Sequence, residues 1–235
     1  MRLAKALDKD LKRSALLASP LFQAMQPGEL DEIVGFASEK RYPRGATIFQ
    51  KGDDGSSLMA VLRGRVRVSA VSAEGKEITL NVISPGEIFG EIALLDGKQR
   101  SADATAVEET VLMVVERRHF LPFVRKNDDL FLRLLAVLCD RLRRTSLALE
   151  ELALFDLPAR LARLLIKLSA DYGRPTPVGI RIDMKLSQRD LSTLVAASRE
   201  SVNKQLGLWR ESGVVDIDGG YIVVCKPTEL QGLVE

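Results

Sequence analysis

Between about Tyr42 and Glu116, short apolar runs alternate with turn-forming residues. Many short runs joined by glycine-rich turns are typical of an antiparallel sandwich or barrel, and no helix-length periodic segment interrupts them. We therefore predict an all-β domain in this region, within an α+β fold. The runs that we assign to strands are Ser57–Leu62, Arg65–Val71, Ile78–Ile83 and Val111–Val115.

A different periodicity follows the predicted strands. Apolar positions recur at intervals that alternate between four and three residues, which is the spacing of a coiled-coil seam. The pattern predicts a long helix over residues 127–153 that pairs with another helix. An ordinary amphipathic helix lying on its own β-domain is the alternative. The stripe consists of Phe131, Leu135, Leu138, Leu142, Thr145, Leu149 and Leu152, and Thr145 is its polar member.

Another helix is predicted to begin near Asp156. Asp156 is a candidate N-cap, Pro158 suits the first turn of a helix, and Gly173 can end it. We place a hinge at Leu154–Asp156 and predict an exposed loop over residues 174–179.

The segment from Ser187 onwards has the pattern of a helix-turn-helix followed by a hairpin. Ser187 resembles an N-cap with the acidic Asp190 three positions on, and a turn at Ala196–Ser198 leads into a second helix. Two apolar runs then flank Asp218-Gly219-Gly220, which predicts the wing of a winged helix. A helical pair with a charged, solvated face is the alternative. The expected inward-facing residues are Leu191, Leu194, Val195, Val202, Leu206 and Trp209.

Composition excludes several classes of protein. At 235 residues, with 46% apolar and 28% charged residues, the chain has the composition of a globular protein and room for two domains. The net charge is only +2, so a DNA-binding surface would have to be a local patch. The two cysteines, Cys139 and Cys225, form no disulfide framework or metal-binding cluster. Met1–Ser19 lacks the apolar core of a signal peptide, and we identify no transmembrane span, so we expect a cytoplasmic protein.

The segment Phe89–Leu95, with Arg100–Ala102 shortly after it, combines a carboxylate and a guanidinium with small residues in what we predict to be one loop. Glu91 can accept a hydrogen bond from a sugar hydroxyl, and Arg100 can bind a phosphate through two nitrogens. Backbone N–H groups near Gly90 and Ser101 can complete an anion-binding nest. A sugar and a phosphate held side by side indicate a nucleotide.

The second helix of the predicted helix-turn-helix carries an outward set of Arg199, Glu200, Asn203 and Lys204. Side chains of these types near a helix N-terminus can reach base edges, because arginine fits guanine O6 and N7 and glutamate accepts from cytosine N4. These residues predict sequence-specific binding to double-stranded DNA.

With these motifs in this order, the chain resembles the cyclic-AMP receptor protein and fumarate–nitrate regulator (CRP/FNR) family of bacterial transcription factors, from about residue 20 to residue 226. Gly90-Glu91-Ile92 with Arg100-Ser101-Ala102 is similar to the family's phosphate-binding cassette. There the glutamate binds the ribose 2′-hydroxyl, and the arginine and serine bind the cyclic phosphate. Thr145-Ser146 matches the pair on the dimerisation helix that contacts adenine in cyclic-AMP-binding members.

The resemblance implies an N-terminal antiparallel β-roll, a long dimerisation helix and a C-terminal winged helix-turn-helix, over residues 1–126, 127–153 and 154–235. Ser198-Arg199-Glu200 matches the start of the recognition helix, and Lys204 departs from the arginine of the cyclic-AMP receptor. The implied ligand-binding residues are Val68, Leu80, Gly90, Glu91, Ile92, Arg100, Ser101, Thr145 and Ser146. The implied DNA-binding residues are Ser187, Gln188, Ser198, Arg199, Glu200, Ser201, Asn203 and Lys204.

The expected function is a homodimeric, cyclic-AMP-responsive regulator of transcription that binds a palindromic operator and contacts RNA polymerase. Cyclic GMP, alone or with cyclic AMP, is the main alternative effector, with cyclic di-GMP and a ligand-independent regulator behind it. We expect no cofactor, metal or catalytic residue, because no Walker loop, metal-ligand cluster or nucleophile–base pair is present. The lone His119 is expected in the first turn of a helix with Pro122, as a structural residue rather than a haem ligand. A nucleotide-binding module with no DNA role is the last alternative.

Overall fold

A computed structural model describes residues 12–14, 16–73, 75 and 77–234 of the chain. Within them the chain divides into two compact units. One unit comprises Met1–Ser72 and Leu80–Arg144, and the other comprises Ala73–Thr79 and Thr145–Glu235. Near the start of the described residues, Leu16, Leu21 and Phe22 are buried, whereas Leu17 is exposed.

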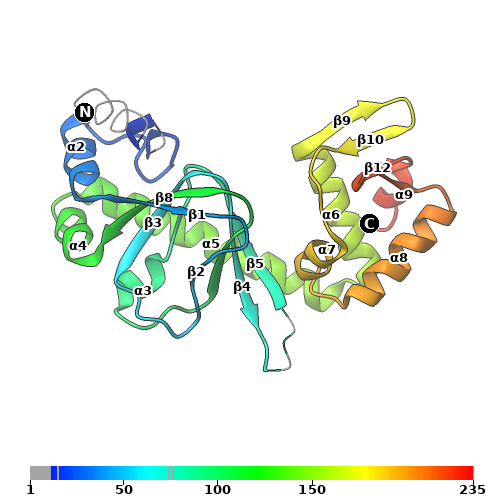
Figure 1. The fold of residues 1–235 in the computed structure, drawn as a ribbon, viewed down its shortest axis with the longest axis horizontal. Helices are drawn as coiled ribbons and strands as arrows, with labels where there is room; N and C mark the ends of the chain where they lie inside the picture. The colour runs from blue at the N-terminus through cyan, green and yellow to red at the C-terminus, as the bar shows by residue number, and fades with distance from the viewer. Residues whose placement is uncertain (1–11, 15, 74, 76, 235) are drawn as a thin grey trace. The chain divides into compact units, whose positions relative to one another are not determined.

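The first unit contains two four-stranded antiparallel sheets, in the orders β1-β8-β3-β6 and β2-β7-β4-β5 (Figure 1). The all-β interpretation of this region is therefore correct in its essentials. Its strands are β1 (Ser38–Tyr42), β2 (Thr47–Phe49), β3 (Ser57–Arg63), β4 (Val66–Val71), β5 (Glu77–Ile83), β6 (Ile88–Phe89), β7 (Asp103–Ala106) and β8 (Thr110–Glu116), although the start of β5, at residues 77–79, is grouped with the second unit. Its short helices are α2 (Pro27–Phe36), α3 (Glu91–Asp96) and α4 (Arg117–Arg125).

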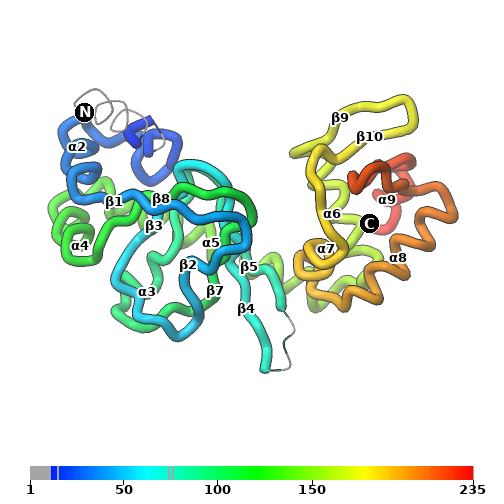
Figure 2. The backbone as a smooth tube through the Cα atoms, in the orientation of Figure 1, coloured from blue at the N-terminus to red at the C-terminus, as the bar shows by residue number. Residues whose placement is uncertain are grey.

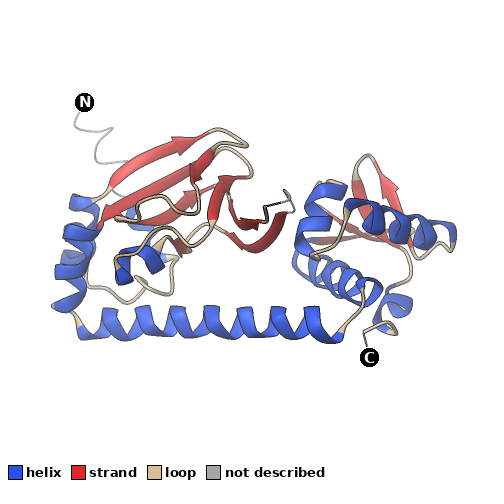
Figure 3. Ribbon diagram, turned by 90° about the horizontal axis from the view of Figure 1, so that it is seen from below, coloured by secondary structure: helices blue, strands red, loops and turns tan. Residues whose placement is uncertain are grey.

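A single continuous helix, α5 (Asp128–Leu154), follows the sheets (Figure 3). Leu130 and Leu134 are buried against the core of the first unit together with Phe120 and Val124 of α4. The apolar stripe predicted to form a seam is a different set of residues, and several of its members are exposed in the single chain. The helix thus has one apolar face, at Leu130 and Leu134, that packs on the first unit, and a second apolar face, the predicted seam, that is largely exposed.

Among the described residues of the second unit, four helices pack around one core with a four-stranded antiparallel sheet of order β11-β12-β10-β9. The path of the chain through these elements can be followed in Figure 2. Asp156 caps the first helix as predicted, because its Oδ1 accepts a hydrogen bond from the N–H of Ala159 at 3.0 Å. Leu161, Leu206 and Trp209 are buried in the common core. The elements are α6 (Leu157–Tyr172), β9 (Gly173–Thr176), β10 (Gly179–Ile182), α7 (Gln188–Leu194), α8 (Arg199–Glu211), β11 (Val215–Asp218), β12 (Tyr221–Val224) and α9 (Pro227–Gln231).

The prediction of an exposed loop over residues 174–179 was wrong, since β9 and β10 form a hairpin there. Pro175 and Pro177 argued against a strand in this segment, because proline has no N–H to donate to a neighbouring strand. Pro175 pairs with Ile180, and β9 is the edge strand of the sheet, where a missing donor is tolerated. Gly179, at φ 151°, lies against the Val224 carbonyl of β12, where a Cβ atom would stand only 2.2 Å from that oxygen.

Candidate functional site

The backbone of Arg100 is fixed by the turn that follows β2. Its N–H donates to the carbonyl oxygen of Asp53 at 2.8 Å, and its own carbonyl accepts from the N–H of Gly52 at 2.9 Å. The Asp53 carboxylate holds the same turn by accepting from the N–H of Gln50 at 2.8 Å. These reciprocal bonds give the Arg100 side chain a defined starting point.

The Arg100 guanidinium is buried and is held by neutral oxygens. Nη1 donates to the carbonyl of Gly90 at 2.8 Å, and Nη2 donates to the carbonyl and the hydroxyl of Ser57 at 3.0 Å each. The group also lies over the ring of Phe49, 4.4 Å from its centroid. Burial lowers the pKa of Arg100, while the charges of Glu91 and Asp53 oppose that shift. Its Nε is buried with no hydrogen-bond partner among the described residues.

Gly90 is required by the geometry of this site. It has a φ of 78°, in the left-handed region, and it is the N-cap of α3. A Cβ atom at this position would stand 2.5 Å from Nη1 of Arg100. Glu91 is therefore the first residue of a helix rather than part of a loop, which corrects the prediction for Phe89–Leu95. A segment of only six helical residues gave too short a periodicity to detect.

Glu91 is 1% exposed, and its partner is a residue that the sequence analysis missed. Arg141 on α5 donates from Nη1 to Oε1 of Glu91 and from Nη2 to the carbonyl of Ile88. Glu91 Oε2 is buried with no hydrogen-bond partner among the described residues. Arg141 is 50 residues from Glu91, so no local pattern links them. The sequence offered one indication that Arg141 lies near the ligand site, namely its position one helical turn before Thr145.

The structure brings Gly90, Glu91 and Arg100 together, with Ser57 and Arg141 added. Of the remaining predicted ligand residues, Val68 is half-buried beside the core of β3 and β8, and Ser101 is exposed. The other four are exposed as well, namely Leu80, Ile92, Thr145 and Ser146.

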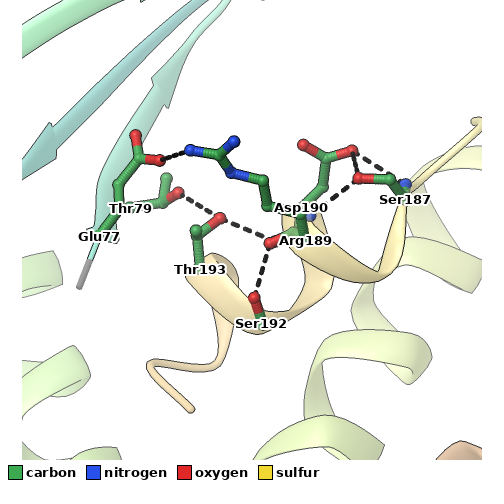
Figure 4. Close-up of polar contacts among 7 residues, drawn as sticks. All are labelled: Glu77, Thr79, Ser187, Arg189, Asp190, Ser192 and Thr193. Carbon is green, nitrogen blue, oxygen red and sulfur yellow. Dashed lines mark hydrogen bonds and ion pairs between the residues drawn. The ribbon is translucent and has the colours of Figure 1, made fainter. Parts of the chain in front are cut away.

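The predicted DNA-reading helices have the expected caps. Ser187 Oγ accepts from the N–H of Asp190 at 3.1 Å, and Asp190 Oδ2 accepts from the N–H of Ser187 at 2.9 Å (Figure 4). The hydroxyl of Thr193 donates to the carbonyl of Asp190 at 2.9 Å. In the same unit, Thr79 Oγ1 donates to Thr193 Oγ1 at 3.0 Å, and Arg189 Nη2 lies 3.3 Å from Glu77 Oε2 (Figure 4).

The second of these helices, α8, begins at the N-cap Ser198, whose Oγ accepts from the N–H of Ser201 at 3.0 Å. Its inward face is buried as predicted, at Val202, Leu206 and Trp209. Most predicted DNA-binding residues are exposed, but Gln188 and Asn203 are half-buried, and Asn203 Oδ1 has no hydrogen-bond partner among the described residues. The exposed residues are Ser187, Ser198, Arg199, Glu200, Ser201 and Lys204.

Two family models match the two units. The cyclic nucleotide-binding domain matches residues 39–127, and the Crp-like helix-turn-helix domain matches residues 159–233. The cyclic AMP receptor protein of Thermus thermophilus is 35% identical over 213 residues, which are 91% of this chain and 95% of that protein. The chain belongs to the CRP/FNR family of transcriptional regulators.

A further sequence relative agrees with this membership, and a solved structure shows the same fold. The CRP-like cAMP-activated global transcriptional regulator of Mycobacterium tuberculosis is 29% identical over 92% of this chain and 96% of its own length. The c-di-GMP responsive global regulator CLP of Xanthomonas campestris has the same fold, with a TM-score of 0.77 over 85% of this chain and 99% of that one, at 22% identity. The matched domains and these names are those of transcriptional regulators.

Membrane-spanning helices and metal-binding clusters are both absent from the part of the chain that the structure describes. No helix among the described residues is both long and apolar enough to span a membrane. No group of three or more histidine, cysteine, aspartate or glutamate side chains within the same residues could hold a metal ion.

Proposed function

We propose that this CRP/FNR protein is a cyclic-AMP-responsive regulator that binds DNA as a homodimer. The observation that carries the proposal is the buried pair of Arg100 and Glu91, each with one polar atom, Nε and Oε2, that has no partner among the described residues. Burying charged groups is unfavourable unless they are paired and hydrogen-bonded. A ligand that brings a phosphate to Arg100 and a ribose hydroxyl to Glu91 would supply the missing partners.

Cyclic AMP is favoured as the effector by the names of relatives, including the cyclic AMP receptor protein of Thermus thermophilus. Thr145 and Ser146 provide hydroxyl groups that can serve the base. Those hydroxyls suit guanine as well as adenine, so cyclic GMP is the second candidate. The Xanthomonas campestris regulator, which is described as c-di-GMP responsive, adds cyclic di-GMP as a third.

The exposed stripe on α5 supports the homodimer. Leu142 is 68% exposed and Leu149 is 67% exposed in the single chain, whereas Leu130 and Leu134 are already buried. Covering a seam of this kind with the same helix of a second copy would remove its apolar side chains from water.

In this proposal, the ligand acts by changing the population of a DNA-competent dimer. Two recognition helices that read successive major grooves must stand about 34 Å apart. To change the ratio of DNA-competent to incompetent dimers from 1:99 to 99:1, the ligand must bind the competent state more favourably by about 5.5 kcal/mol. Residues 154–156, from the last residue of α5 to the N-cap of α6, are the proposed hinge. As a bacterial regulator, the dimer would meet its operator and RNA polymerase in the cytoplasm.

The proposal is tested by calorimetric titration with cyclic AMP and cyclic GMP in parallel. In Arg100→Gln, loss of charge-assisted bonds of about 1.5–3 kcal/mol should weaken cyclic AMP binding by about 10- to 150-fold. Arg63→Gln, which removes an exposed arginine at the end of β3, is the matched control and should bind normally. Thr145→Ala should weaken cyclic AMP binding as well. Unchanged affinity in Arg100→Gln would refute the assignment of the site.

A further inference from the structure

The wing of the second unit has no positive charge of its own. Residues 215–224 include Asp216 and Asp218 but neither lysine nor arginine. Gly219 and Gly220 have φ values of 56° and 86°, which allow a tight two-residue turn between β11 and β12. Because the DNA backbone is negatively charged, this wing needs cations from neighbouring elements to approach it.

Tyr221, the first residue after that turn, lies next to two such cations. The Arg181 guanidinium carbon is 4.9 Å from the centroid of its ring, and Lys185 Nζ is 5.2 Å from it. Both distances suit a cation–π interaction. The strand register explains the first contact, since Arg181 of β10 pairs with Val223 of β12 and Tyr221 is two residues away on the same face.

A third cation joins from the edge strand, where Arg174 pairs directly with Arg181. Asp183 lies between them, with Oδ2 at 2.7 Å from Arg174 Nη2 and Oδ1 at 3.2 Å from Arg181 Nη2. The two arginines therefore share one carboxylate, and with Lys185 on the Tyr221 ring the cluster keeps a net positive charge. We call Arg174, Arg181, Lys185 and Tyr221 the β10 basic patch. Ile182, Ile222 and Val224 point into the core on the opposite face of the sheet.

The patch has a defined position within the second unit. Lys185 stands two residues before Ser187, the N-cap of α7, and Tyr221 follows the wing turn directly. The patch thus connects the two elements that flank the recognition helix α8 in a winged helix. Side chains already fixed by an aromatic ring and a shared carboxylate lose less conformational freedom when they bind.

We propose that the β10 basic patch binds backbone phosphates of DNA beside the bases that α8 reads. This inference rests on the proposed function, because it needs the chain to bind DNA. The patch contributes affinity without sequence preference, since its cations are placed to meet phosphates rather than base edges.

The test measures DNA affinity against salt concentration by fluorescence anisotropy, using the full chain with saturating cyclic AMP. The probes are a duplex selected from a random library by the wild-type protein and a shuffled duplex of equal length. A plot of log affinity against log salt has a negative slope, and Arg181→Gln should make that slope shallower by about 0.9 for each phosphate that the variant no longer neutralises. Tyr221→Leu should also make the slope shallower. Arg181→Lys, which keeps the positive charge, should have a slope close to that of the wild-type protein. The ratio of affinities for the two duplexes should not change.

The matched control is Lys167→Gln, which removes one exposed positive charge from α6 outside the patch and should leave the slope unchanged. A folded Arg181→Gln protein with the wild-type slope would overturn the inference and leave the proposed function intact. A slope that becomes equally shallow in Lys167→Gln would also overturn it, because net charge alone would explain the effect. Failure of the wild-type protein to bind either duplex would instead refute the proposed function itself.

Discussion

Replacing Gly90 with alanine separates the role of this residue in folding from its role in the ligand site. Gly90 has a φ of 78°, and an added Cβ atom would lie 2.5 Å from Nη1 of Arg100. The substitution therefore adds backbone strain of about 1–2 kcal/mol and displaces the guanidinium from the Gly90 carbonyl. Gly45 is the matched control, because its φ is 82° but nothing lies within 4 Å of an added Cβ atom.

In urea denaturation monitored by circular dichroism, Gly45→Ala should lose about 1–2 kcal/mol of stability from backbone strain alone. Gly90→Ala should lose more than Gly45→Ala, because it also displaces the buried Arg100 guanidinium from the Gly90 carbonyl. Only Gly90→Ala should also lose cyclic AMP affinity in calorimetry. Loss of the charge-assisted bonds of Arg100, at about 1.5–3 kcal/mol, corresponds to a factor of about 10 to 150. A Gly90→Ala protein that binds cyclic AMP as tightly as Gly45→Ala would show that the position of Arg100 does not determine binding, and would refute the reasoning.

Three further predictions concern the other parts of the molecule. Arg141→Gln should lower the midpoint of thermal unfolding of the ligand-free protein, because it leaves the Glu91 carboxylate buried without its cation. Arg144 is more exposed, so Arg144→Gln should leave the midpoint unchanged. Equal midpoints for the two variants would contradict this prediction. Leu142→Asp should give monomers in sedimentation velocity, while Leu132→Asp, an exposed leucine outside the stripe, should leave the dimer intact. Arg199→Ala should remove the preference for a selected duplex over a shuffled one without changing cyclic AMP affinity, and an equal loss on both duplexes would mean that Arg199 contacts only phosphate.

Local signals in the sequence were sufficient for the elements that depend on local physics. The caps at Asp156 and Ser187 were predicted because a side-chain oxygen satisfies a nearby N–H whatever the tertiary structure. The buried face of α8 followed from helical spacing alone. The alternation of short apolar runs and glycine-containing turns predicted the β-rich unit, because strand and turn preferences are also local properties of the sequence.

The sequence was less informative where one element depends on another distant in the chain. Arg141 could not be assigned to Glu91 from spacing, since their contact depends on how α5 packs beside β6 and α3. The β9–β10 hairpin was missed because Pro175 is acceptable only at a sheet edge, and the sequence does not reveal which strand is the edge. The basic patch was missed likewise, because Arg174, Arg181 and Tyr221 become neighbours only through strand register.

The central claim is that a cyclic nucleotide bound at Arg100 and Glu91 controls DNA binding by the second unit. The most direct test is the affinity of the full chain for its selected duplex, measured with and without cyclic AMP, in the wild-type protein and in Arg100→Gln. We predict that cyclic AMP strengthens binding in the wild type and has a much smaller effect in Arg100→Gln, whose affinity without ligand is unchanged. Equal DNA affinity of the wild type with and without the nucleotide, or an equal response in both proteins, would contradict the account.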